Sequence, residues 1–91
     1  MTTDSFTDYK ILKFLEEEGE SKTRAIWVHL LEEYDDFSWS TLSRHLKKLN
    51  VKGFLEKRRD LDKDLDYWRI TEAGLKEIEE IGRISHKREG S

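Results

Sequence analysis

Apolar side chains recur at three- and four-residue spacing in the first part of the chain, which is the pattern of amphipathic helices. One stripe consists of Tyr9, Ile11, Leu12, Phe14 and Leu15, and a second of Ile26, Trp27, Leu30, Leu31 and Tyr34. We expect the first helix to begin at Asp8 behind a Thr7 cap and to end at Gly19. The second helix is expected to have Ser21 or Thr23 as its cap.

A third helix, over about 38–50, has the clearest start signal in the chain. Ser38 is a favourable N-cap residue. Phe37 and Leu42 have the spacing of a hydrophobic staple, in which the residue before the cap packs against the first full turn. Gly53 is expected to stop this helix, because glycine readily adopts the backbone conformation that closes a helix.

After Gly53 the hydrophobic pattern is no longer helical. Residues 54–59 and 67–71 are predicted to form two strands, because β-favouring side chains gather there. The charged segment 60–66 between them is expected to form a loop or an extended hairpin tip. The expected hairpin therefore covers about 54–71. A short strand at 21–23 would add a third strand to it.

A fourth helix is expected over about 72–85, with Thr71 as its cap. Its apolar stripe consists of Leu75, Ile78, Ile81 and Ile84. Residues 86–91 are expected to form a flexible tail. The predicted fold is mostly α, a single domain over 1–85 with the layout of a winged helix-turn-helix: three helices, a two- to three-stranded β-hairpin wing and an additional C-terminal helix.

Three stretches of the chain resemble a known group of proteins. Residues 40–49 (STLSRHLKKL) and 52–55 (KGFL) resemble the recognition helix and wing entry of the ArsR, MarR and PadR families of prokaryotic winged-helix regulators. Residues 67–74 (YWRITEAG) are similar to the passage from wing to helix in the MarR and PadR families. The resemblance, over about 9–81, implies a winged-helix fold and DNA binding. The metal-sensing chemistry of some ArsR members is not implied, because the chain has no cysteine and no clustered histidines.

The third helix has one apolar and one basic face. On a helical wheel Leu42, Leu46 and Leu49 share the face that points to the core. In a helix-turn-helix the opposite face enters the major groove of double-stranded DNA. Arg44 suits a bidentate contact with guanine, whereas lysines here suit phosphates. The candidate DNA-binding residues of this helix are Ser38, Trp39, Ser40, Thr41, Ser43, Arg44, Lys47 and Lys48.

Charge is distributed unevenly along the chain. The segment from Ser38 to Arg59 contains seven basic residues and one acid, Glu56, so its net charge is 7 − 1 = +6. Since the whole chain carries −3, the remainder carries −3 − 6 = −9. Such a polarised charge distribution can steer DNA to one side of an acidic protein.

The start of the wing adds Lys57, Arg58 and Arg59 to the candidate DNA-binding residues. These side chains suit phosphates flanking the groove, but charges on an edge strand also deter aggregation, and the sequence leaves both interpretations open. Four acids follow at once, so we do not expect the wing tip to enter a minor groove: Asp60, Asp62, Asp64 and Asp66.

The acidic segment partly matches a calcium-binding loop. Asp60, Asp62 and Asp64 have the spacing of the first three ligands of an EF-hand. The sixth position is Leu65 where the motif needs glycine, and the twelfth is Thr71 where it needs glutamate. We therefore expect no metal here, and the sequence predicts no cofactor elsewhere.

Several other classes of protein are disfavoured by composition. The sequence has no Gly-rich phosphate loop, no nucleophile with a neighbouring base and no cluster of metal ligands, so an enzyme is not expected. No apolar run is long enough for a bilayer, and the absence of cysteine suits a reducing compartment. We expect a cytoplasmic protein without a membrane partner.

The leading functional hypothesis is a small transcriptional regulator that binds double-stranded DNA as a homodimer, because paired half-sites supply the specificity that one recognition helix lacks. The expected dimer surface is the stripe of the fourth helix, Leu75, Ile78, Ile81 and Ile84, although packing over the core explains this stripe equally well. The alternative is a winged-helix module that binds a protein partner in a larger complex. The source is expected to be a bacterium, an archaeon or a virus or plasmid of either.

Overall fold

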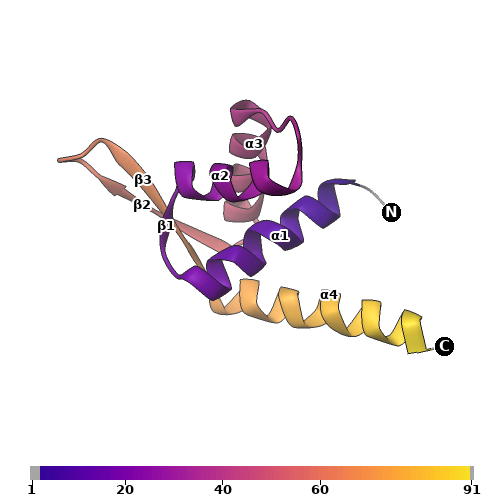
Figure 1. Ribbon diagram of the computed structural model, residues 1–91. Helices are drawn as coiled ribbons and strands as arrows, with labels where there is room; N and C mark the ends of the chain where they lie inside the picture. The colour runs from indigo at the N-terminus through magenta and orange to yellow at the C-terminus, as the bar shows by residue number, and fades with distance from the viewer. Residues whose placement is uncertain (1–2, 91) are drawn as a thin grey trace.

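The computed structural model describes the backbone of residues 3–90 and the side chains of residues 6–82. The elements follow in the order α1 (Thr3–Glu18), β1 (Ser21–Lys22), α2 (Thr23–Glu33), α3 (Trp39–Val51), β2 (Leu55–Asp60), β3 (Leu65–Ile70) and α4 (Glu72–Gly90). The strands form an antiparallel sheet in the order β1-β3-β2. In Figure 1 the hairpin of β2 and β3 projects away from the helices, and α4 lies alongside α1. The predicted fold class is confirmed, with a three-stranded wing.

The core lies where α1, α2 and α3 meet the base of the wing. Eight leucine and isoleucine side chains from the three helices are almost completely buried there, and Leu55, Trp68 and Ile78 close the core from the wing and α4. The buried helical residues are Ile11, Leu12, Leu15, Ile26, Leu30, Leu42, Leu46 and Leu49. Leu31, which belongs to the apolar stripe predicted for the second helix, is exposed instead.

Both ends of α3 follow the sequence prediction. The Ser38 hydroxyl accepts a hydrogen bond from the Thr41 amide at 3.1 Å, as an N-cap does. At the other end the Phe54 amide donates to Leu49 O at 3.0 Å and the Gly53 amide donates to Asn50 O at 3.0 Å. This is a Schellman motif, and the φ of +86° at Gly53 explains why glycine stands there.

The predicted starts of the first two helices are wrong. Thr7 does not cap α1: the helix begins at Thr3, and the Thr7 side chain is buried within it, 3.1 Å from the Tyr34 hydroxyl. Lys22 is the N-cap of α2, without a side-chain hydrogen bond. Neither predicted cap forms: Ser21 lies one residue before the cap position and donates to Gly19 O, and Thr23 is already the first helical residue, where it accepts from the indole of Trp68.

The acidic segment forms an extended hairpin tip, which is one of the two alternatives that its sequence left open. Strand β2 continues to Asp60 and β3 begins at Leu65, so the connection is only residues 61–64. The Asp60 carboxylate accepts hydrogen bonds from the amides of Asp62 and Lys63, and Asp64 adopts a left-handed φ of 57°. Aspartate favours such turns through these side-chain contacts, which explains a tight hairpin without glycine.

The junction between the wing and α4 joins three elements. The Thr71 hydroxyl accepts from the Gly74 amide at 3.1 Å, which confirms the predicted cap, and donates to Gly53 O at 2.6 Å at the end of α3. The Thr71 amide donates to Phe54 O at 3.0 Å. A Cβ added to Gly74 would lie 2.4 Å from the same Phe54 O, so only glycine allows this approach.

Helix α4 continues to Gly90, beyond the end predicted near Ser85. The backbone of residues 86–90 is therefore helical rather than an irregular tail. The side chains of residues 83–91 lie outside the described part of the chain, and the predicted flexibility of this segment stays a prediction.

Candidate nucleic-acid interface

The outer face of α3 carries the residues predicted to meet DNA. The buried faces of Leu42, Leu46 and Leu49 fix the orientation of the helix. This orientation leaves four side chains exposed on the opposite side: Ser40, Ser43, Arg44 and Lys47. No acid stands anywhere in α3. Among the side chains described, no carboxylate forms an ion pair with Arg44 or Lys47.

A chain of hydroxyl groups connects the start of α3 to Arg44. Ser38 Oγ donates to Thr41 Oγ1 at 2.7 Å, and Arg44 Nη2 donates to the same oxygen at 3.3 Å. The capping residue and the central arginine are therefore linked through Thr41. These contacts orient the guanidinium along the helix surface.

Asp8 of α1 contacts α3 through two residues. Its Oδ1 accepts from His45 Nδ1 at 2.7 Å, and its Oδ2 lies 2.8 Å from Lys48 Nζ. Asp8 and His45 are mostly buried, whereas Lys48 is half-buried. No local sequence pattern predicts this cluster, because Asp8 and His45 are 37 positions apart. Lys48, a predicted phosphate ligand, thus has a carboxylate partner within the chain.

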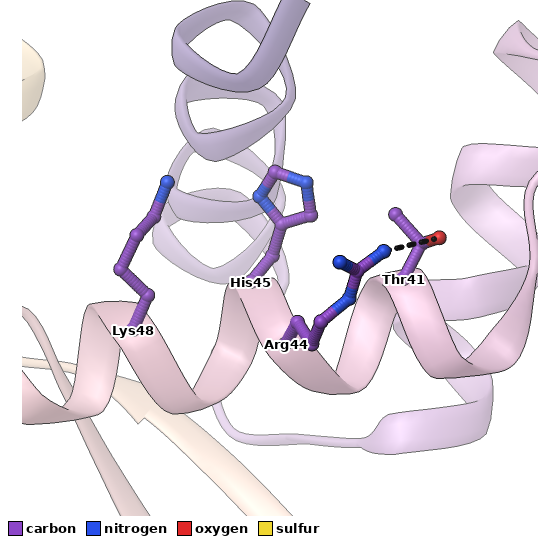
Figure 2. A pocket seen from close by; sticks show the side chains of 4 residues that line it. All are labelled: Thr41, Arg44, His45 and Lys48. Atoms are coloured by element: carbon purple, nitrogen blue, oxygen red, sulfur yellow. Dashed lines mark hydrogen bonds between the residues drawn. The ribbon is translucent and has the colours of Figure 1, made fainter.

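A hollow of about 170 Å³ lies on the side of α3 that faces α1. It is lined by four residues of successive helical turns, Thr41, Arg44, His45 and Lys48. In Figure 2 His45 and Lys48 point toward the neighbouring helix, while Arg44 bends back toward Thr41. All four side chains carry hydrogen-bond donors, and no acid among the described side chains lines the hollow.

A wider groove of about 480 Å³ separates α3 from the wing. Ser43 and Lys47 line one side, and Lys57 and Trp68 line the other. The Lys57 ammonium lies 5.9 Å from the Trp68 ring centre, a cation–π arrangement, and forms no ion pair with a described carboxylate. Trp39 lies at one end of the groove with nearly half of its surface exposed. The structure thus brings the predicted residue Lys57 next to the outer face of α3.

Arg58 lies on the other face of the wing. Its Nε and Nη2 donate to both carboxylate oxygens of Glu20 at 3.1 and 3.0 Å, and its guanidinium lies 4.5 Å from the Tyr67 ring centre. This bidentate hydrogen bond lowers the pKa of Glu20 below its ordinary 4.5 and raises the pKa of Arg58. The contact fastens the start of β1 to the wing.

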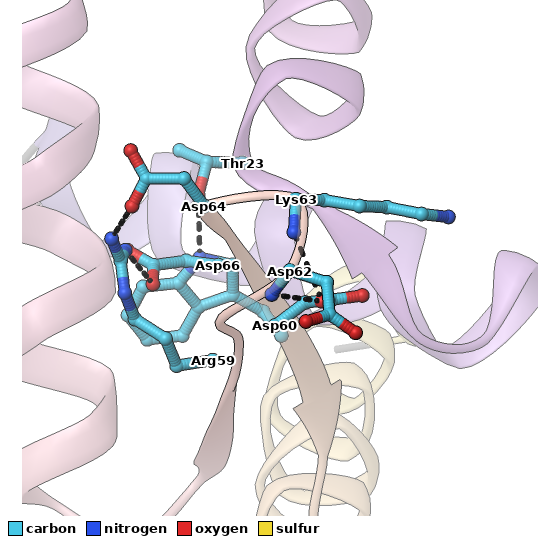
Figure 3. Close-up of polar contacts among 8 residues, drawn as sticks. Thr23, Arg59, Asp60, Asp62, Lys63, Asp64 and Asp66 are labelled. Carbon is cyan, nitrogen blue, oxygen red and sulfur yellow. Dashed lines mark hydrogen bonds and ion pairs between the residues drawn. The ribbon is translucent and has the colours of Figure 1, made fainter.

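Arg59 is held by two aspartates of its own hairpin. Its Nη1 donates to Asp66 at 2.8 Å, and its Nη2 contacts Asp64, as Figure 3 shows. The hydrogen bond with Asp66 is the main reason that the pKa of Arg59 is raised. The wing tip therefore neutralises part of its own charge.

Among the residues with described side chains, no group of three acids or histidines is placed to hold a metal ion.

The residues predicted for a dimer surface fall in different environments. Ile78 packs in the core, Ile81 is half-buried, and Leu75 is exposed. Ile84 lies outside the described side chains.

No helix within the described part of the chain is both long and apolar enough to span a membrane.

Three helices, a hairpin wing packed beside the third helix, and a basic outer face on that helix define a winged helix-turn-helix domain. Similar solved structures belong to the same class. A transcriptional regulator from Clostridium thermocellum has a TM-score of 0.82 at 21% identity, and the match covers 99% of this chain and 92% of that one. At this identity the likeness shows the fold.

Two further structures are somewhat more similar in sequence. RosR of H. salinarum is 26% identical with a TM-score of 0.80, over 97% of this chain and 76% of RosR. F93 from STIV, described as a winged-helix DNA-binding protein, is 27% identical with a TM-score of 0.71, over 84% of this chain and 83% of F93. No protein-family model and no curated protein matches the sequence.

Proposed function

We propose that this protein is a transcriptional regulator that binds double-stranded DNA with α3 in the major groove. The observation that carries this proposal is the outer face of α3, which has no acid and presents Arg44 and Lys47 without a carboxylate partner among the described side chains. Regulators and DNA-binding domains among the similar structures support the same function. We expect the protein to act in the cytoplasm of a bacterium or archaeon, or of a cell infected by one of their viruses.

We assign different roles to the predicted contacts. With α3 in the major groove, Ser40, Ser43 and Lys47 would meet base edges, and Lys57, across the groove from Lys47, would meet phosphates. Trp39 supplies an exposed ring at the start of the helix. Arg58 and Arg59 already have carboxylate partners, so we assign them to holding the wing.

We further propose that two copies bind together. One recognition helix reads only a few base pairs, and a symmetric pair reads two half-sites about one helical turn apart. The exposed Leu75 on α4 is the apolar side chain that we assign to this contact. Sedimentation analysis of the wild type and Leu75→Lys tests the assignment: a dimer that becomes monomeric supports it, and a monomeric wild type contradicts it.

The first experiment is a titration of the protein into labelled duplex DNA at about 50 and 200 mM salt, followed by fluorescence anisotropy. A protein that contacts several phosphates loses affinity steeply over this range, with a log–log slope of about −0.9 per contact. The double variant Arg44→Ala, Lys47→Ala should lose most of this binding, whereas Lys63→Ala, a control that removes one positive charge at the wing tip, should keep most of it.

Absence of wild-type binding at the lower salt would contradict the DNA-binding proposal without affecting the fold. The remaining hypothesis would then be a module that binds a protein partner. Equal binding of DNA by the wild type and the double variant would contradict the role of α3, but it would not contradict DNA binding by the protein.

A further inference from the structure

The hydroxyl of Thr41 has a hydrogen atom without an acceptor among the described residues. A hydroxyl accepts up to two hydrogen bonds and donates one. Both acceptor positions of Thr41 Oγ1 are used, by Ser38 at 2.7 Å and by Arg44 at 3.3 Å. Its own hydrogen is therefore available to an acceptor from outside the chain, at the edge of the hollow that Thr41 lines.

The other groups around this hollow also have unused donors. A guanidinium has five N–H groups and an ammonium three. Arg44 gives one N–H to Thr41, and Lys48 directs its ammonium to Asp8 at 2.8 Å. Most of their donors therefore remain unused. The hollow, about 170 Å³, is much larger than the roughly 10–15 Å³ that a cavity needs to hold one water molecule.

We propose that this hollow binds one phosphate group, with Thr41, Arg44 and Lys48 as hydrogen-bond donors. The identification of that phosphate as part of a DNA backbone rests on the proposed function. A helix in the major groove has a phosphate chain on each side. The hollow lies on the side of α3 toward α1, and Lys57 lies on the side toward the wing, so the two positions match the two chains.

This assignment changes the roles predicted from the sequence. Arg44 becomes an anchor on the backbone instead of a reader of guanine. Lys47 lies on the wing side of α3 beside Ser43 and has no carboxylate partner among the described residues, so it is the cation left to contact a guanine edge.

Asp8 is the positioning residue of this site. Its negative charge opposes an anion, but its two oxygens are occupied by His45 and Lys48, and it does not line the hollow. It holds the Lys48 ammonium at the edge of the hollow before a ligand arrives. An ordered donor loses less conformational freedom on binding than a free lysine.

The first arm of the test uses inorganic phosphate and needs no DNA. Phosphate is titrated into the protein at constant ionic strength and followed by ¹H–¹⁵N NMR. We expect saturable shifts of the Thr41 amide and the Arg44 Nε–H. Arg44→Gln should abolish saturation, and Lys63→Gln, which removes an exposed wing-tip charge, should preserve it. Shifts that grow without saturation, or that are as large at Lys63, would overturn the proposal.

The second arm uses duplex DNA. Arg44→Gln should weaken binding equally for all sequences and make the salt slope shallower by about 0.9, which is the loss of one phosphate contact. An unchanged slope with relaxed preference at one base pair would overturn the proposal, because Arg44 would then read a base. Saturable phosphate binding by a wild type that binds no DNA would support the site, contradict the proposed function and direct attention to a phosphorylated ligand.

Discussion

Asp8 on α1 and His45 on α3 form a hydrogen bond of 2.7 Å, with 13% and 8% of their side-chain surfaces exposed. Since an ionised carboxylate only accepts hydrogen bonds, the ring Nδ1 is the donor. Lys48 approaches the second oxygen at 2.8 Å. The position of α3 against α1 is therefore fixed by a polar contact in addition to the apolar core.

Replacing Asp8 with alanine should destabilise the fold, because it removes a mostly buried hydrogen bond between a carboxylate and the ring of His45. We expect the free energy of unfolding to fall by about 1–3 kcal/mol, measured by urea unfolding. His45→Ala and the double variant complete a thermodynamic cycle, in which contacting residues typically show a coupling of about 0.5 kcal/mol or more. Strictly additive losses would show that the contact contributes nothing to stability.

Gly74→Ala should destabilise the junction between α4 and the wing. The new Cβ would meet the Phe54 carbonyl oxygen at 2.4 Å and the Ile70 side chain at 2.7 Å. Overpacking of this kind costs about 1–3 kcal/mol, which lowers the melting temperature of a domain this size by about 4–8 °C per kcal/mol.

The matched control for this substitution is Gly82→Ala in the same helix. Nothing lies within 4 Å of a Cβ added there. Alanine is the better helix former, so this control should raise stability by about 0.5–1 kcal/mol. Equal effects of the two substitutions would contradict the close approach at Gly74.

The contact between Glu20 and Arg58 should contribute a small stability that depends on pH. The hydrogen bond with Arg58 lowers the pKa of Glu20 in the folded chain. Because the pKa of Glu20 is lower in the folded chain than in the unfolded chain, the contact stabilises the fold at pH values above the unfolded-state pKa, near 4.5. This contribution to stability is lost as the pH falls through the folded-state pKa of Glu20. A carboxyl NMR titration should place the midpoint of Glu20 below 4.5, and Arg58→Ala should return it to the ordinary range. A midpoint that Arg58→Ala leaves unchanged would disprove the contact.

Ser38 offers a way to separate folding from DNA binding. Ser38→Ala removes the cap of α3 and should cost about 0.5–2 kcal/mol in thermal unfolding. Ser38→Asp keeps a capping oxygen and places a negative charge at the positive end of the helix, so stability should be retained. The same charge would face DNA phosphates and should weaken DNA binding in the anisotropy titration. Unchanged affinity of a stable Ser38→Asp would place the start of α3 away from the DNA.

Local patterns were sufficient for both ends of the third helix and for the presence of the wing, but not for the bounds of its strands. Ser38 and Gly53 determine where α3 begins and ends through contacts with residues three to five positions away, so sequence alone predicts them. The order of elements and the apolar face of α3 followed from spacing in the same way. The candidate basic face was therefore predictable without a structure.

Contacts between distant elements were not predictable. Ser21 and Thr23 have good capping side chains, but each is used elsewhere, Thr23 by the indole of Trp68. In the sequence alone, every cation of the basic segment is an equal candidate for DNA binding. In the fold, Lys48 and Arg58 have carboxylate partners, whereas Arg44, Lys47 and Lys57 have none among the described side chains. The partners, Asp8 and Glu20, lie far away in the sequence, so the sequence does not show this difference.

The junction of Gly53, Phe54, Thr71 and Gly74 has a mechanical consequence. Thr71 donates two hydrogen bonds to the residues that follow α3, Gly53 and Phe54. Gly74, in the first turn of α4, packs closely against the Phe54 carbonyl oxygen. A rotation of α4 about this point would carry the end of α3 with it. In an assembly of two chains held through α4, the distance between the recognition helices would then depend on the angle at which the two α4 helices cross.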